Sequence, residues 1–120
     1  MYIDELGVKF SDDRTKLIST PLELKGEYVV PDGVTVIDEA AFQRCEQLTS
    51  VVFPEGLTTI DNSAFMFCKA LQSVQFPKSL KWLEAGAFTY CSSLKSVTLH
   101  SKDIDTSGVF DPDCEIKYDV

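Results

Sequence analysis

The chain has 120 residues, of which 44% are hydrophobic and 25% are charged, and its net charge is -8. This length suits one domain, 1–120, with the composition of a globular protein and not of a disordered or collagen-like chain. No apolar stretch reaches the roughly 20 residues of a membrane helix, so we expect no membrane insertion. Negative charge without a basic stripe argues against nucleic acid as a partner.

The N-terminal residues 1–27 are expected to form a cap. The stretch GVKFSDDRTKLI places two short apolar pieces on either side of the polar run 11–14, which predicts a β-hairpin. Residues 1–10 lack the basic and apolar regions of a secretory signal, so we expect no signal peptide in this chain.

Residues 28–100 repeat with a period of 23 residues. Such a period, carried by apolar side chains, indicates a solenoid in which each coil buries its inner face against its neighbours. We expect like residues to stack at about 4.8 Å per strand step. The columns at this spacing are Phe42, Phe65 and Phe88; Cys45, Cys68 and Cys91; Leu48, Leu71 and Leu94; and Val51, Val74 and Val97.

Two short strands are expected in each repeat. In LTSVVF, the side chains of Val51 and Phe53 face one side of a sheet and those of Ser50 and Val52 face the other. The strand should end at Pro54, because proline has no amide hydrogen to donate. The pair Leu57 and Ile60, spaced alike in the adjacent repeats, predicts a second strand on another side of the coil.

A helix of one or two turns is expected after the second strand. Asp38, Asp61 or Glu84 stands directly before EAAFQRC, NSAFMFC or AGAFTYC. A carboxylate at this place caps the free amides of a first helical turn. The Phe and Cys that follow are three residues apart, so they would share the core face of such a helix. The predicted fold is therefore an α/β repeat solenoid with a parallel strand ladder.

Residues 101–120 are expected to form a degenerate closing coil. The period would place apolar residues at positions 103 and 106, but Asp103 and Thr106 stand there. Cys114 keeps the period, Phe110 comes one step early, and CEIKYDV reads as a final strand. Residues 101–120 carry six acids and two bases, whereas residues 34–100 carry six and five. An acidic outer end suits the polar cap that a solenoid needs.

The repeated pattern Leu-x-Ser-Val-x-Phe-Pro-x-x-Leu-x-x-Ile-Asp-x-x-Ala-Phe-x-x-Cys resembles the BspA-type leucine-rich repeat over about residues 28–100. That family is common in surface proteins of gut and oral bacteria. The resemblance implies a right-handed coil, a cell-surface or secreted setting, and an adhesin-like or receptor-like module without catalytic residues. A cytoplasmic location stays open, because we expect no signal peptide here.

The outward face of the long strands is the first candidate binding surface, because its side chains can vary without disturbing the core. We expect it to bind a protein, or less readily a glycan. The same small polar residues would also suit a plain solvated sheet on a spacer unit of a larger surface protein, so both readings stay open. The candidate residues are Ser50, Val52, Gln72, Ser73, Gln75, Lys95, Ser96 and Thr98.

A second candidate surface is an aromatic patch, because exposed apolar patches often mark interfaces. The alternative is that these side chains only cover the seams between coils. Its members are Met66, Phe67, Trp82 and Tyr90.

We expect no metal, no cofactor and no enzymatic activity. The four cysteines include no Cys-x-x-Cys pair and His100 is the only histidine, which argues against zinc. The stacked cysteines are better explained as buried apolar groups, although adjacent coils could bring two thiols within disulfide range. The sequence has no Gly-rich phosphate loop and no Gly-x-Ser-x-Gly motif, and DPDCEIKYD lacks the spacing of an EF-hand.

Overall fold

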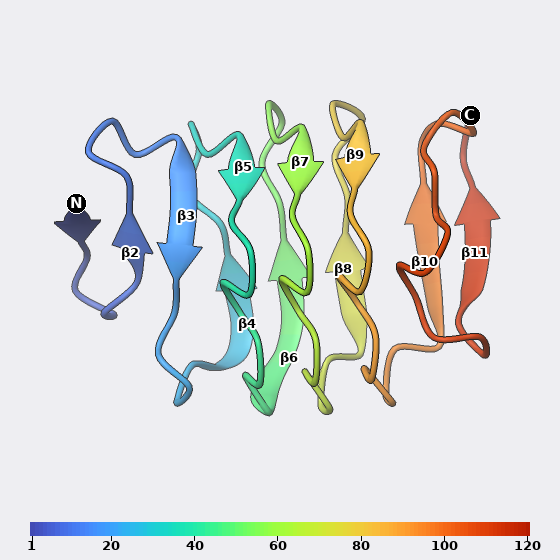
Figure 1. Ribbon diagram of the computed structural model, residues 1–120, viewed down its shortest axis with the longest axis horizontal. Helices are drawn as coiled ribbons and strands as arrows, with labels where there is room; N and C mark the ends of the chain where they lie inside the picture. Colours follow the sequence, from blue (N-terminus) through green and yellow to red (C-terminus); the bar gives the residue numbers. More distant parts are fainter.

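A computed structural model describes residues 1–120 as a stack of coils built from eleven strands and no helix (Figure 1). One sheet, in the order β1-β2-β3-β5-β7-β9, contains β1 (Tyr2–Ile3), β2 (Lys9–Phe10), β3 (Lys16–Ser19), β5 (Val36–Ile37), β7 (Thr59–Ile60) and β9 (Trp82–Leu83). A second sheet contains β4 (Lys25–Val29), β6 (Gln47–Val52) and β8 (Ser73–Gln75). A third contains β10 (Ser96–Leu99) and β11 (Glu115–Tyr118).

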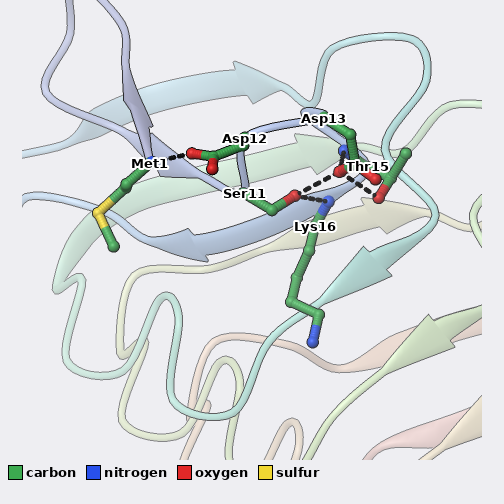
Figure 2. A network of polar contacts seen from close by, with 6 residues as sticks. All are labelled: Met1, Ser11, Asp12, Asp13, Thr15 and Lys16. Carbon is green, nitrogen blue, oxygen red and sulfur yellow. Dashed lines mark hydrogen bonds and ion pairs between the residues drawn. The ribbon is translucent and has the colours of Figure 1, made fainter.

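The N-terminal end is an antiparallel meander. β2 pairs with β3 as a hairpin, and β1, which the sequence did not predict, pairs with the outer side of β2. The turn is held by Asp13, whose Oδ1 accepts the Thr15 amide at 3.1 Å and the Ser11 hydroxyl at 2.8 Å (Figure 2). These hydrogen bonds lower the pKa of Asp13, because they stabilise its charged form. Met1 and Asp12 form an ion pair beside it.

Parallel ladders follow on two sides of the coil. β5, β7 and β9 pair in succession, and Ile37, Ile60 and Leu83 lie side by side. β4, β6 and β8 form the other ladder, which lies behind the first in Figure 1 and places Val51 beside Val74. The partners between neighbouring repeats are 23 positions apart, so the predicted strand ladder and its second strand are confirmed.

The core is a column of stacked phenylalanines. The ring centroids of Phe42 and Phe65 are 4.4 Å apart, and those of Phe65 and Phe88 are 4.9 Å apart. All three side chains are at most 1% exposed. Phe53 and Phe76 form a second stack at 5.7 Å and meet Phe65 and Phe88 edge-on. The predicted stacking of like residues is confirmed, and the second stack adds to it.

The predicted helix in each repeat is wrong: the segments after β5, β7 and β9 are turns. A helix needs each amide to bond the carbonyl four residues earlier in the same coil. Here the amides of Phe42 and Arg44 donate to Ala64 and Met66 of the next coil, at 2.7 and 2.9 Å. The left-handed φ angles of 57° at Ala40 and 65° at Arg44 also exclude a helix.

Two of the three acids in front of these turns, Asp38 and Asp61, bond a neighbouring amide instead of capping a helix, and Glu84 makes no such bond. Asp38 Oδ1 accepts the amide of the next residue, Glu39, at 2.9 Å. Asp61 does the same for Asn62 at 2.7 Å. The capping chemistry predicted from the sequence is therefore that of a turn.

The closing coil is shorter than the others. Val97 of β10 pairs with Ile116 of β11, 19 positions later. Phe110 nevertheless reaches the core and stacks on Phe88 at 5.4 Å. The Cys114 amide donates to the backbone carbonyl of Asp111, three residues earlier, just as the Leu94 amide donates to the carbonyl of Cys91. Cys114 therefore takes the place of a leucine and not that of a stacked cysteine. The shortening occurs where the periodic apolar pattern stops.

Candidate interaction surfaces

The outward strand face carries the eight predicted residues in two ladders. β6 and β8 set Ser50 beside Ser73 and Val52 beside Gln75. Ser96 and Thr98 lie on β10, which pairs with β11 and not with β8. Gln72 and Lys95 directly precede β8 and β10. The face is therefore a three-stranded row followed by a separate two-stranded one.

Most of this face is open to solvent. Ser50 and Val52 are half-buried, and the other six predicted residues are exposed. The Ser50 hydroxyl donates to Glu27 Oε1 at 3.3 Å, and Lys95 Nζ lies 3.4 Å from Asp113 Oδ2.

Two neighbours of this face were not predicted as site residues. Val29 is 58% exposed beside Val52, which gives the face an apolar spot. The alternation of the strand predicts Val29 to face outward in the same column as Val52 and Gln75, although it was not chosen as a site residue. Asp113 comes from the closing coil, whose changed length hides its position from a count of 23.

The four predicted aromatic-patch residues do not form one patch. Phe67 and Tyr90 stack with ring centroids 4.7 Å apart, and the Arg44 guanidinium lies 4.4 Å from the Phe67 ring. These three residues occupy equivalent turn positions with φ of 65°, 64° and 58° in chain order. The structure thus brings Phe67 and Tyr90 together and adds Arg44, which was not a predicted site residue.

Met66 and Trp82 do not join this stack. Met66 is half-buried, its Sδ is 3.9 Å from Gln43 Nε2, and its Cε lies so close to Gly86 that a Cβ there would meet it at 3.1 Å. Trp82 is 55% exposed on β9, with Lys81 Nζ 5.9 Å from its ring centre. Trp82 lines two surface hollows of about 310 and 390 Å³.

The cysteines are four buried free thiols. Cys68 Sγ donates to the Phe42 carbonyl and Cys91 Sγ to the Phe65 carbonyl, both at 3.1 Å, so each thiol also bonds the previous coil. Burial raises the pKa of Cys68, and it raises the pKa of Cys91 to about 12. Thiols with raised pKa values hold little thiolate and are poor nucleophiles.

No group of three His, Cys, Asp or Glu side chains is arranged to hold a metal ion. His100 does have a neighbour that the sequence did not indicate, because its Nδ1 lies 3.3 Å from the Asp119 carbonyl and 4.0 Å from Asp119 Oδ2. The structure contains no helix, and so none that is long and apolar enough to cross a membrane.

Stacked coils of 23 residues, with parallel strands on two sides and columns of Leu, Phe and Cys inside, define a leucine-rich-repeat solenoid. The family model described as BspA type leucine rich repeat region (6 copies) matches residues 24–117. The chain therefore belongs to the BspA-type leucine-rich repeat family. No curated protein sequence matches it significantly.

Solved structures with the same fold come from bacterial proteins. The pneumococcal vaccine antigen PcpA is 23% identical with a TM-score of 0.73, over 95% of this chain and 36% of that one. A leucine rich cell surface protein of Faecalibacterium prausnitzii is 22% identical with a TM-score of 0.68, over 98% and 39%. A leucine-rich repeat protein of Eubacterium ventriosum is 20% identical with a TM-score of 0.67, over 97% and 39%. This chain spans little more than a third of each, and the likeness concerns the fold.

Proposed function

We propose that this chain is a non-catalytic recognition module that binds a protein through the outward face of its strand ladder. The observation that carries the proposal is that β6 and β8 hold Ser50 beside Ser73 and Val52 beside Gln75 in hydrogen-bonded register, while the core lies on the other side of these strands. Side chains on a rigid ladder can vary without disturbing the core, and a partner that binds them loses little free energy to ordering the backbone. A glycan is the second choice of partner, and display on a bacterial surface is the setting we favour.

The apolar spot on this face supports the proposal. Val29 and Val52 lie side by side among polar neighbours, and Gln75 continues their row on β8. A small apolar centre with a polar rim is the usual anatomy of a protein interface.

A spacer role remains the alternative, and one observation favours it. The Ser50 hydroxyl donates to Glu27, so these two polar groups of the face already have hydrogen-bond partners within the protein. A surface of this kind needs no partner.

Capture experiments with two variants separate these functions. Immobilised protein is incubated with extracts of bacterial or host cells, and the bound proteins are identified. The double change Gln75→Lys and Thr98→Lys places two charges on the face and should abolish specific capture. The matched control, Asn62→Lys with Ser92→Lys, adds the same charge at exposed turn positions and should capture as the parent does. Capture by the double-lysine face variant equal to that of the control would refute binding through this face, and absence of specific capture by the parent would support the spacer role.

A further inference from the structure

All but one of the exposed aromatic side chains of this protein have a cation of the same chain over the ring. The four are Tyr2, Trp82, Tyr90 and Tyr118. Three of them have a cation of the same chain over the ring: Arg14 lies 3.6 Å from the Tyr2 centroid, Lys81 5.9 Å from that of Trp82 and Lys102 5.7 Å from that of Tyr118. Tyr90 has none, although at 60% it is the most exposed of the four.

Tyr90 is one end of a surface stack whose other end is a guanidinium, that of Arg44. Arg44, Phe67 and Tyr90 are at equivalent positions in three coils, and the Arg44 guanidinium lies 4.4 Å from the Phe67 ring centre. Tyr90 covers the opposite side of the column, with its ring tilted only 7° from that of Phe67. No aromatic ring of the closing coil stacks on Tyr90, whose side chain is 60% exposed.

A carboxylate without a cation stands beside this ring. Asp111 accepts the Tyr90 amide on Oδ1 at 2.7 Å and the Cys91 amide on Oδ2 at 3.0 Å, which fixes its position. No lysine or arginine pairs with it, whereas nearby Asp113 has Lys95 at 3.4 Å. Each carboxylate oxygen can accept a second hydrogen bond. The surrounding segment, residues 101–120, carries six acids and two bases.

From these contacts we infer that Tyr90 and Asp111 form a binding site for an arginine side chain of a basic partner protein. A guanidinium would lie over the exposed ring of Tyr90, as Arg44 lies over Phe67, and would donate to the free lone pairs of Asp111. Arginine fits better than lysine, because its planar cation stacks on rings and donates from a fixed fork. The site lies on the turn side of the coil, away from the strand face, and so goes beyond the function proposed above.

The test is an NMR titration of the full chain with blocked peptides. The probe contains two arginines separated by glycine, and matched peptides contain lysine or the neutral isostere citrulline. We expect the arginine peptide to shift the amide signals of Tyr90, Cys91 and Asp111. We expect the lysine peptide to bind roughly two- to fivefold more weakly and the citrulline peptide not at all. Equal binding of the arginine and lysine peptides would overturn the inference, because it would indicate attraction to acidic charge alone.

Variants locate the site. Tyr90→Asn removes the ring but tolerates the left-handed φ of 58°, and it should weaken arginine-peptide binding by roughly two- to fivefold. Tyr90→Phe should bind as the parent does. Trp82→Thr is the control, because Thr59 holds the same place one coil earlier, and it should also leave binding unchanged. Unchanged binding by a folded Tyr90→Asn protein would overturn the inference.

The strand face is tested apart from this site. The variant Gln75→Ala with Thr98→Ala should keep full arginine-peptide binding, because neither residue contacts Tyr90. A loss of binding in that variant would place the arginine site on the strand face and overturn the assignment to Tyr90.

Discussion

The interior coils and the closing coil satisfy the same backbone amides with different groups. Within the repeats, the amide of Phe67 donates to the carbonyl of Thr89 in the next coil at 3.1 Å. At the equivalent place in the last repeat, the amide of Tyr90 donates to the carboxylate of Asp111 at 2.7 Å. At this position a repeat with a full neighbour bonds a backbone carbonyl, and the last repeat bonds a side chain.

The difference shows how a repeat protein can end. Interior coils are interchangeable because each one offers the carbonyls and apolar side chains that its neighbour needs. The closing coil still offers the Val109 carbonyl to the Phe88 amide, but it is shorter and offers no carbonyl to Tyr90, so the Asp111 carboxylate takes that place. We therefore expect mutations in the interior to cost packing energy and mutations in the closing coil to cost hydrogen bonds.

The largest expected effect is in the phenylalanine column. Phe65→Ala should lower the free energy of unfolding by about 3–5 kcal/mol, because it opens a cavity between Phe42 and Phe88. Phe110→Ala should cost about half as much, since Phe110 is only half-buried at the end of the column. Urea denaturation monitored by circular dichroism gives both values. Equal losses would show that the closing coil packs as tightly as the interior.

A smaller effect is expected at the carboxylate that closes the stack. Asp111→Ala should cost about 1–3 kcal/mol, because two amides lose their acceptor. The matched control is Asp113→Ala, where the only partner is an exposed lysine and the change should be under about 1 kcal/mol. The same denaturation experiment applies, and a similar cost for both variants would mean that Asp111 does not close the last coil.

The smallest effect is a dependence of stability on alkaline pH. Burial raises the pKa of Cys68 and raises that of Cys91 to about 12, so their thiols stay protonated in the folded protein after those of the unfolded chain, near 8.5, have ionised. Their contribution is complete below pH 8.5 and is lost as the pH rises toward the folded pKa. The free energy of unfolding should fall by up to about 1.4 kcal/mol per pH unit for each such thiol.

Denaturation between pH 7 and 9 measures this fall, about one unit below the pKa near 10 at which tyrosines of the unfolded chain ionise. The variant Cys91→Ala removes one titrating thiol and should show a shallower slope than the parent. A parent slope no steeper than that of Cys91→Ala would contradict the raised pKa of Cys91.

Cys114, in the closing coil, is 9% exposed and should react first with a thiol reagent in the folded protein, ahead of Cys68, which is fully buried.

The main error of the sequence analysis was the helix in each repeat. The run from Asp61 to Cys68 has an acid at the start and core residues three apart, as a short helix would. Turns that repeat every few residues place side chains on one face in the same way. The segment forms turns and not a helix because amides such as that of Phe65 donate to carbonyls of the next coil, here that of Ala87. One repeat read alone cannot show that bond.

The candidate sites were predicted unevenly for a similar reason. Alternation along a strand was enough to place Ser73 and Gln75 outward, because strand geometry is local. The aromatic patch required knowing which side of the coil each ring occupies, and Trp82 lies on a different side from Tyr90. Asp111 lies where the coil shortens, so no count along the sequence could assign its partners.

By itself, the sequence determined the period of 23, the stacked columns and hence the family, because equivalent apolar residues at a fixed spacing can be buried only by one another. The tertiary structure alone decided whether the third side of each coil is helix or turn, where the strand face is divided, and how the stack ends. Those outcomes depend on hydrogen bonds between neighbouring coils, and such bonds form only once the coils lie against each other.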